Sequence, residues 1–343
     1  MTPVKVLVVD DSAFMRMQFR SFLEGDNRFR IVGEARDGEE ALKMAQELKP
    51  DVVILDLELP KKTGIEVLKQ IMRNHPIPVL IVSSHAKENA QITLDALQLG
   101  AVDFLTKPSA SQMNEMRETF PAKLLQVSRA KVWRLSSLIK IPPPRPKFHL
   151  PSKSSKLIVI GASIGGPQAI RHLIPRLPPD FPAPILVIQH LPKGYSSRFI
   201  ESLAAESQIL VKEAAPFMPL RAGTVFVAPG GKHLVLNHQK KIMLTDDPPV
   251  NSVRPSIDVT LVSCAQLFKK DLIAVILTGM GKDGTKGAVE VKLSGGIVIA
   301  ESEASCVVYG MSKSVIEAGA CDFAISLEKI PDFIMEKLTC QTN

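Results

Sequence analysis

Ser163 lies in a stretch whose residue types and spacing suit chemistry. In Leu157-Ile-Val-Ile-Gly-Ala-Ser-Ile-Gly-Gly-Pro167, an apolar run typical of a buried strand is followed by a glycine turn and a helix start. The free N–H groups of a helix N-terminus favour negative charge, so a hydroxyl here could serve as a nucleophile. A turn that cradles dinucleotide phosphates and a purely structural turn fit this stretch equally well.

Two residues further along the chain favour the nucleophile. The apolar run 184–189 is typical of a strand and ends at His190, and the run 271–278 precedes a glycine-rich turn with Asp283. Parallel strands bring their carboxyl ends to one edge, where the histidine can deprotonate the serine and the carboxylate can orient the imidazole. A dinucleotide site would leave His190 and Asp283 without roles. The chain order Ser, His, Asp also differs from that of α/β-hydrolases.

A second group of polar side chains follows apolar runs in the first third of the chain. Strand and helix patterns alternate from Val4 to Leu105, which predicts a five-stranded parallel sheet with helices on both faces. The residues at the strand ends are Asp10, Asp11, Asp56, Ser83 and Lys107. Neighbouring carboxylates repel one another unless a cation joins them, and oxygen ligands suit Mg²⁺. Lys107 could neutralise an added anion, and Ser83 could donate a hydrogen bond to it.

The net charge of +7 is concentrated in the middle of the chain. Residues 109–155 carry 9 Lys or Arg against 2 Asp or Glu, whereas residues 1–108 carry 14 against 16 and residues 156–343 carry 19 against 17. A regulator that binds DNA would have a small, basic, helical output region, so nucleic acid is not an expected partner. The proline-rich basic segment is expected to be a linker that is either simply solvated or docks to an acidic partner.

The strand-end residues of the first third resemble those of receiver domains of two-component response regulators. The resemblance covers about residues 3–125 and implies that Asp56 accepts the phosphoryl group. It further implies Mg²⁺ held by Asp11, Asp56 and the backbone carbonyl of Glu58, with Asp10 helping through water. Ser83 and Phe104 match its switch positions, and Lys107, followed by Pro108, matches the lysine that precedes a proline in the receiver pattern.

The whole chain resembles chemotaxis protein-glutamate methylesterases. The stretches that carry the resemblance begin at Gly161, Gln189, Ala228, Arg254, Leu277 and Val308. It implies hydrolysis of glutamate methyl esters on chemoreceptor helices, with glutamine deamidation as a second activity and no cofactor for ester hydrolysis. Backbone N–H groups after Ser163 and at Met280 would hold the oxyanion. Ile164 and Ser312 depart from common family residues, and neither belongs to the proposed triad.

We therefore predict three regions and two doubly wound α/β domains. Residues 1–125 form the flavodoxin-like receiver, 126–155 the basic linker, and 156–343 a largely parallel hydrolytic domain. The segments 224–227 and 242–245 are predicted to form a small antiparallel addition, and the loop 246–249 to overhang the cleft. His233 and Arg254 are predicted to shape the site.

The same resemblance implies partners and regulation. A chemotaxis-type histidine kinase would phosphorylate the receiver, and methylated chemoreceptor helices would be the substrate. The unphosphorylated receiver is expected to obstruct access to Ser163. No apolar run reaches bilayer-spanning length, so neither membrane insertion nor a location other than the cytoplasm is expected.

Overall fold

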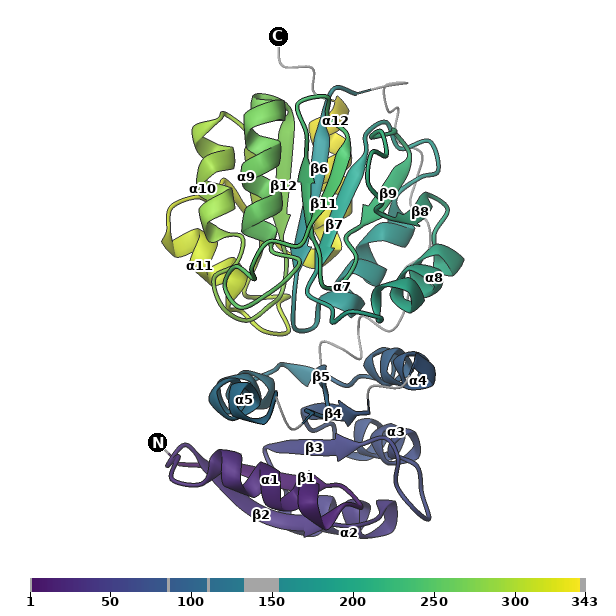
Figure 1. Ribbon diagram of the computed structural model, residues 1–343, viewed down its shortest axis with the longest axis vertical. Helices are drawn as coiled ribbons and strands as arrows, with labels where there is room; N and C mark the ends of the chain where they lie inside the picture. Colours follow the sequence, from purple (N-terminus) through teal and green to yellow (C-terminus); the bar gives the residue numbers. More distant parts are fainter. Residues whose placement is uncertain (1, 85–86, 110–111, 133–153, 340–343) are drawn as a thin grey trace. The chain divides into compact units, whose positions relative to one another are not determined.

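The chain forms two compact units, Met1–Ile139 and Lys140–Asn343, which we call the N-terminal unit and the C-terminal unit (Figure 1). The computed structural model describes residues 2–84, 87–109, 112–132 and 154–339. The division between the units and most of the predicted linker 126–155 lie outside these residues. The predicted region bounds therefore stay a prediction.

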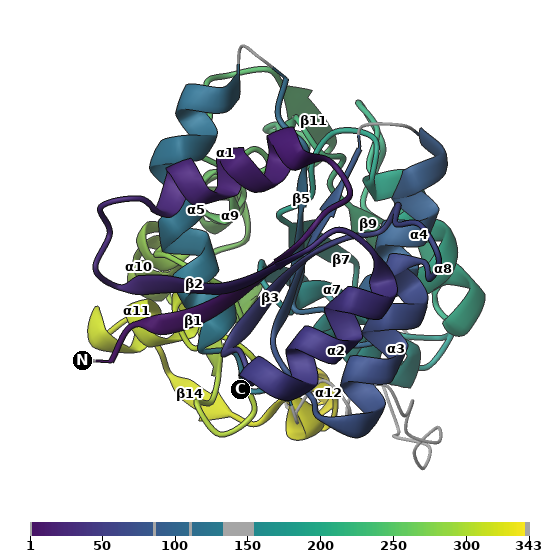
Figure 2. The same cartoon turned by 90° about the horizontal axis from the view of Figure 1, so that it is seen from below.

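The N-terminal unit is built on a five-stranded parallel sheet in the order β2-β1-β3-β4-β5. Its strands are β1 (Val4–Val9), β2 (Phe29–Ala35), β3 (Val52–Asp56), β4 (Val79–Ser83) and β5 (Asp103–Thr106). Its helices are α1 (Ala13–Leu23), α2 (Gly38–Leu48), α3 (Gly64–Asn74), α4 (Lys87–Gln98) and α5 (Met113–Ser128). Helices α1 and α5 cover one face of the sheet and α2, α3 and α4 cover the other (Figure 2).

Local sequence signals start α1 and α3, and aromatic packing joins α1 to α5. The side chains of Ser12 and Thr63 accept hydrogen bonds from the first turns of α1 and α3, as N-caps do. Phe120 of α5 lies 5.3 Å from the ring centroid of Phe19 and 5.8 Å from that of Phe22, both on α1. This contact fixes α1 and α5 against the same face of the sheet.

The C-terminal unit has a seven-stranded parallel sheet in the order β14-β13-β12-β6-β7-β9-β8 and a separate hairpin, β10-β11. The strands are β6 (Leu157–Ala162), β7 (Ile185–Gln189), β8 (Leu210–Glu213), β9 (Thr224–Val227), β10 (His233–Leu236), β11 (Ile242–Thr245), β12 (Leu272–Ile276), β13 (Ile297–Glu301) and β14 (Phe323–Ile325). The helices are α7 (Gly166–Leu173), α8 (Ser196–Glu206), α9 (Ile257–Phe268), α10 (Thr285–Leu293), α11 (Met311–Glu317) and α12 (Ile330–Thr339).

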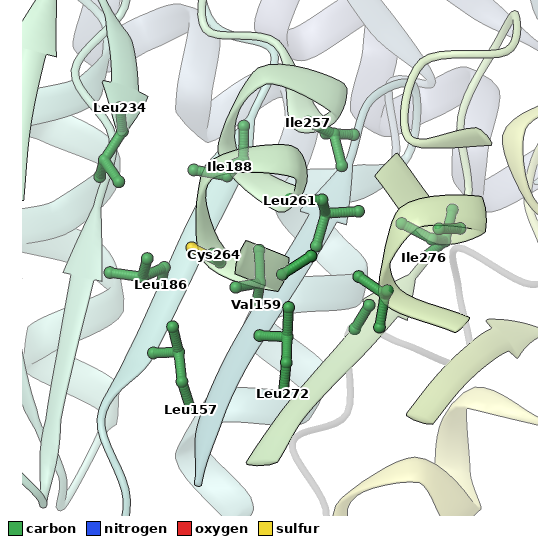
Figure 3. Packing of buried hydrophobic residues seen from close by; sticks show 14 of the residues in the cluster. Leu157, Val159, Leu186, Ile188, Leu234, Ile257, Leu261, Cys264, Leu272 and Ile276 are labelled. Carbon is green, nitrogen blue, oxygen red and sulfur yellow. The ribbon is translucent and has the colours of Figure 1, made fainter. Parts of the chain in front are cut away.

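Alternate residues of the central strands form the core of the C-terminal unit (Figure 3). Leu157 and Val159 of β6 lie beside Leu186 and Ile188 of β7, and all four are fully buried. Their period of two places them on one face of the sheet, where α9, α10, α11 and the hairpin contribute further buried residues. The predicted fold class, two α/β units with parallel sheets and a small antiparallel addition, is confirmed.

One detail of the predicted antiparallel addition is wrong. The segment 224–227 is β9, which pairs in parallel with β7 and with β8 inside the main sheet. The partner of β11 is instead β10, and the two strands pair from His233↔Thr245 to Leu236↔Ile242. All four residues of β9 are buried, which suits a strand inside a sheet covered on both faces, but a short apolar run does not reveal its pairing direction.

Both parallel sheets have a point at which successive strands are added in opposite directions. It lies between β1 and β3 in the N-terminal unit and between β6 and β12 in the C-terminal unit. Sites in such sheets form outside the carboxyl ends of the two strands at this point. Among the helices that the structure describes, none is both long enough and apolar enough to cross a membrane.

Candidate functional site

Three carboxylates meet at the carboxyl ends of β1 and β3 in the N-terminal unit. Asp10, Asp11 and Asp56 each bring an oxygen atom within 4.8 Å of those of the other two. Asp10 and Asp56 are each 1% exposed, whereas Asp11 is exposed to solvent. The backbone N–H of Ser12 binds Asp10 and that of Glu58 binds Asp56, so turn geometry fixes both buried carboxyl groups.

Lys107 is the cation that faces the two buried carboxylates. Its Nζ lies 2.6 Å from Asp56 Oδ2 and 3.0 Å from Asp10 Oδ2. Burial raises the pKa of Asp56 to about 6, although the hydrogen bond and charge of Lys107 act in the opposite direction. Burial likewise raises the pKa of Asp10. Lys107 alone therefore does not fully compensate the negative charge of the two buried carboxylates. A divalent cation that prefers oxygen ligands, such as Mg²⁺, would supply further positive charge.

The remaining predicted residues of this site lie on the adjoining strands. Ser83 ends β4, is 1% exposed and pairs with Thr106, and its carbonyl accepts the Lys107 backbone N–H at 2.8 Å. No hydrogen bond joins Ser83 to Asp56 within residues 2–84. Phe104 on β5 is 4% exposed, so its ring lies inside the unit. The structure thus places Lys107 on the acidic cluster and Ser83 at the end of the neighbouring strand, while Phe104 lies buried further along β5.

In the C-terminal unit, Ser163 follows β6 at the edge where the strand order reverses. Its backbone N–H donates to the Thr278 carbonyl at 3.0 Å, which binds the turn to the segment after β12. A Cβ atom on Gly279 would lie 2.8 Å from the Cβ of Ser163, so only glycine allows this approach. The Gln189 side chain also donates to the Ser163 carbonyl at 3.0 Å. The turn that carries Ser163 is therefore fixed from both neighbouring strands.

His190 and Asp283 meet at the same edge. Ala162 and Gln189 are register partners, so the residues that follow them, Ser163 and His190, leave adjacent strands side by side. Nε2 of His190 lies 2.8 Å from Oδ2 of Asp283. This hydrogen bond uses Nε2 as the donor and leaves Nδ1 as the acceptor for another proton. Ser163 and His190 share no hydrogen bond in the described part of the C-terminal unit.

The N-terminus of α9 holds the Asp283 carboxylate. It accepts hydrogen bonds from the Ser256 hydroxyl at 2.7 Å and the backbone N–H of Ile257 at 2.7 Å and Asp258 at 3.2 Å. Burial raises the pKa of Asp283, but the hydrogen bonds from His190, Ser256 and Ile257 outweigh burial and lower the pKa to about 2. The carboxylate is consequently ionised at neutral pH, as the partner of a protonated imidazole must be.

Helices α9 and α10 cap each other. Asp283, just before α10, binds the first N–H groups of α9, and Asp258, in the first turn of α9, binds the Gly287 N–H of α10 at 2.7 Å. Asn251 donates one amide group to both carboxylates, at 2.9 Å to Asp258 and 3.1 Å to Asp283. The side chain that contacts His190 is therefore also part of the helix packing.

Two backbone N–H groups beside Ser163 are available to a ligand. Within residues 154–339, the N–H groups of Ile164 and Met280 donate no hydrogen bond to the protein. Gly279, next to Met280, is held by hydrogen bonds from Gly310 and Met311 to its carbonyl. Unpaired N–H groups on rigid turns are the usual donors to an oxyanion, so the positions predicted for that role have the right chemistry.

His233 and Arg254 support the loop that follows β11. His233 is fully buried; its Nδ1 accepts the Ser256 N–H at 3.1 Å and its Nε2 donates to the Pro248 carbonyl at 3.1 Å. Arg254 donates to the carbonyls of Asp246 and Asp247. His233 therefore reaches Asp283 through Ser256, and Arg254 supports the segment that leads to Asn251, which also contacts Asp283.

Several residues of this site were not singled out from the sequence. They are Gln189, Asn251, Ser256, Asp258, Thr278 and Glu301. Ser256 and Asp258 carry the ordinary signal of a helix start, an N-cap serine followed by an acid in the first turn. That signal predicts the beginning of α9 but not the carboxylate that arrives from residue 283.

Glu301 at the end of β13 gives a prediction for stability. Burial raises its pKa from 4.5 to about 7. Its stabilising contribution is therefore full below pH 4.5 and is lost as the pH rises through 7, where the folded state must ionise it. The unfolding free energy of Glu301→Gln relative to that of wild type should therefore increase as the pH rises from 4.5 to 7. The gain should reach about 3 kcal/mol above pH 7.

Urea unfolding at pH 5 and pH 8, followed by hydrogen exchange of residues 272–301, would measure this gain in the C-terminal unit alone. The exposed Glu336→Gln is the matched control and should show no pH-dependent gain. A gain of equal size at both pH values would contradict the prediction.

The two units together define a class of protein: a response regulator whose output unit is an α/β enzyme. The response regulator receiver family model matches residues 6–119, and the CheB methylesterase family model matches residues 158–334. The chain belongs to the protein-glutamate methylesterase/protein-glutamine glutaminase family. The predicted family and the predicted class of enzyme are confirmed.

Two curated relatives are similar to this chain over nearly its full length. A protein-glutamate methylesterase/protein-glutamine glutaminase of Thermotoga maritima is 45% identical over 337 residues, 97% of this chain and 98% of the relative. One of Symbiobacterium thermophilum is 42% identical over 348 residues, 97% of this chain and 96% of the relative. The crystal structure of the Thermotoga maritima CheB methylesterase catalytic domain matches with a TM-score of 0.52 and 47% identity, covering 54% of this chain and 99% of that one.

Proposed function

We propose that this chain hydrolyses glutamate methyl esters on chemoreceptor helices by a Ser163–His190–Asp283 mechanism that phosphorylation of Asp56 regulates. The observation that carries the proposal is the 2.8 Å contact of His190 with Asp283 at the strand edge where Ser163 emerges. It supplies a base with a defined tautomer beside a hydroxyl on a rigid turn. Glutamine side chains, with ammonia as the leaving group, are the second substrate.

The reaction follows from the order of these groups. Nδ1 of His190 takes the Ser163 proton as the hydroxyl oxygen attacks the ester carbonyl carbon, and Asp283 stabilises the resulting imidazolium. The N–H groups of Ile164 and Met280 stabilise the oxyanion. Its collapse breaks the bond to the methoxy oxygen, which takes the imidazolium proton and leaves as methanol. Water then hydrolyses the glutamyl-serine ester by the same base and releases glutamate.

The N-terminal unit supplies the regulatory chemistry. Asp10, Asp11, Asp56 and the Glu58 carbonyl are the groups that would hold Mg²⁺, which when bound supplies positive charge to balance an incoming phosphoryl group. Phosphorylation of Asp56 adds negative charge beside Lys107, and Ser83 on the adjoining strand is the hydroxyl that would turn toward it. A chemotaxis-type histidine kinase is the proposed phosphodonor. The cytoplasmic location remains a prediction.

Methanol release from methylated chemoreceptor by the full chain tests the function. We expect release that rises when a small phosphodonor and Mg²⁺ are added, by roughly 5–150-fold for ordinary allosteric coupling. Unmethylated receptor is the matched control and should give none. Absence of methanol with the phosphorylated chain, or equal release from a simple unrelated methyl ester, would contradict the proposed substrate.

Asp56→Asn should abolish the phosphodonor response while leaving basal methanol release unchanged, because an amide cannot accept the phosphoryl group. Incorporation of labelled phosphate and methanol release would be measured on the same samples. Asp51→Asn is the control, since this exposed carboxylate stands at the opposite end of β3 and should behave as wild type. Full activation of Asp56→Asn would place the phosphorylated residue elsewhere.

A further inference from the structure

Thr278 binds the nucleophile turn at two points. This residue follows β12 and is fully buried. Its carbonyl accepts the Ser163 N–H at 3.0 Å, and its hydroxyl donates to the Ile164 carbonyl at 2.9 Å. Thr278 therefore binds both the N–H at the start and the carbonyl at the end of the Ser163–Ile164 dipeptide. A shift of Thr278 would move the hydroxyl of Ser163 together with the proposed oxyanion donor of Ile164.

The same hydroxyl ties a third segment to this turn. The backbone N–H of Val308 donates to Thr278 Oγ1 at 2.9 Å, and the N–H of Gly279 donates to the Val308 carbonyl at 3.0 Å. Next to it, Val307 packs so closely on Gly165 that a Cβ there would lie 2.8 Å from the Val307 Cβ. The segment after β13 thus contacts the turn that carries Ser163 in two ways: Val308 binds Thr278, and Val307 packs on Gly165.

Glu301 holds Thr278 from the other side. Its Oε2 accepts the Thr278 N–H at 2.8 Å, and the side chain is 1% exposed at the end of β13. The groups that face it are the side chains of Ser305 and Cys306 and the more distant charge of Glu328. No salt bridge to a cation reaches Glu301 within residues 154–339. Burying such a carboxyl group costs stability, and an apolar residue would fill the space without that cost.

We propose that Thr278 and Glu301 are positioning residues for Ser163: Glu301 fixes the Thr278 backbone, and Thr278 fixes the Ser163–Ile164 peptide. The inference rests on the function proposed above, because it assigns a task in the same reaction. Both side chains are buried, and neither is assigned a contact with the substrate in the proposed mechanism. Their effect should appear in kcat, since a displaced nucleophile slows attack while the surface that binds the receptor helix is unchanged.

Thr278→Val removes the hydroxyl and keeps the shape, and Glu301→Leu removes the acceptor. Each should lower kcat for methanol release by about 10–100-fold with KM within about threefold of wild type, the loss expected of a displacement of about 1 Å. Thr278→Ser and Glu301→Gln retain the hydroxyl and the acceptor oxygen. These conservative variants should recover kcat to within about threefold of wild type.

The controls separate this inference from the function on which it rests. Thr224→Val removes a buried hydroxyl at the start of β9, the opposite end of the sheet, and should keep wild-type kcat. Ser163→Ala in the same assay tests the function itself. If Ser163→Ala is inactive but Thr278→Val and Glu301→Leu keep wild-type kcat, the positioning inference is overturned while the function stands. Loss of kcat in Thr278→Ser and Glu301→Gln as large as in Thr278→Val would also overturn it, since folding rather than the hydrogen bonds would then decide activity.

Discussion

Ser163→Ala should abolish methanol release from methylated chemoreceptor. The variant lacks the only side-chain oxygen that the proposed mechanism uses to form the acyl-enzyme, so kcat should fall by about 10⁴-fold or more. The measurement is a single-turnover and steady-state assay with the phosphorylated full chain. Because Asp56 and Ser163 belong to different compact units, Asp56 of the variant should still accept phosphate at the wild-type rate.

Ser197→Ala is the matched control for this experiment. Ser197 is an exposed serine on α8 that the mechanism does not use, and its loss should leave kcat at the wild-type value. Residual activity of Ser163→Ala within about tenfold of wild type would remove Ser163 as the nucleophile, since such a small loss is typical of an indirect contact rather than of covalent chemistry.

Asp283→Asn should lower kcat by about 10³–10⁴-fold and also destabilise the C-terminal unit. An asparagine cannot neutralise the imidazolium, and its amide group would face donors where the wild-type carboxylate accepts from His190, Ser256 and α9. Losing one such acceptor in a buried site costs about 1–3 kcal/mol of unfolding free energy. Methanol release and urea unfolding of the same preparations would measure both effects.

Asp258→Asn is the control that separates the catalytic role proposed for Asp283 from its role in helix packing. Asp258 takes part in the same helix capping but makes no hydrogen bond to His190 among the contacts described. At neutral pH it should therefore lose less stability than Asp283→Asn, because removing its charge also relieves the repulsion from Asp283, and kcat should stay within about tenfold of wild type. Equal losses of kcat in Asp283→Asn and Asp258→Asn would mean that Asp283 acts only through the fold.

The pH dependence of stability distinguishes the same pair. The pKa of Asp283 is lowered from 3.8 to about 2, so its contribution is present above pH 3.8 and is lost as the pH falls through 2. Burial and the Asp283 charge raise the pKa of Asp258, so its contribution has the opposite sign and is lost as the pH rises. Acid therefore weakens the α9–α10 junction through Asp283.

The positions of the functional strand ends could be predicted from the sequence because parallel strands deliver their last residues to one edge. Asp10, Asp56 and Lys107 meet in the N-terminal unit for this reason, and His190 meets Asp283 in the C-terminal unit. Short apolar runs and glycine turns are enough to place those ends. They do not define pairing direction, so the sequence does not show that residues 224–227 pair in parallel inside the main sheet.

The supports of the site could not be predicted in this way. Ser256 reaches Asp283 across 27 residues, and Glu301 reaches Thr278 across 23. Each is an unremarkable serine or glutamate in its local sequence, and its partner is chosen by the packing of β12, β13 and α9. These contacts depend on tertiary packing, so the local sequence does not predict them.

The pairing of β12 with β6 also has a consequence for synthesis, because the site at this edge cannot form until both strands have been made. Ser163 emerges with β6, yet the strand that pairs with β6 and carries Thr278 is made more than a hundred residues later, as the 114-residue separation of Thr278 from Ile164 shows. A nascent chain therefore carries Ser163 before Thr278 and Asp283 have been made. All strands of the N-terminal sheet are synthesised before β6, well before the C-terminal sheet can form.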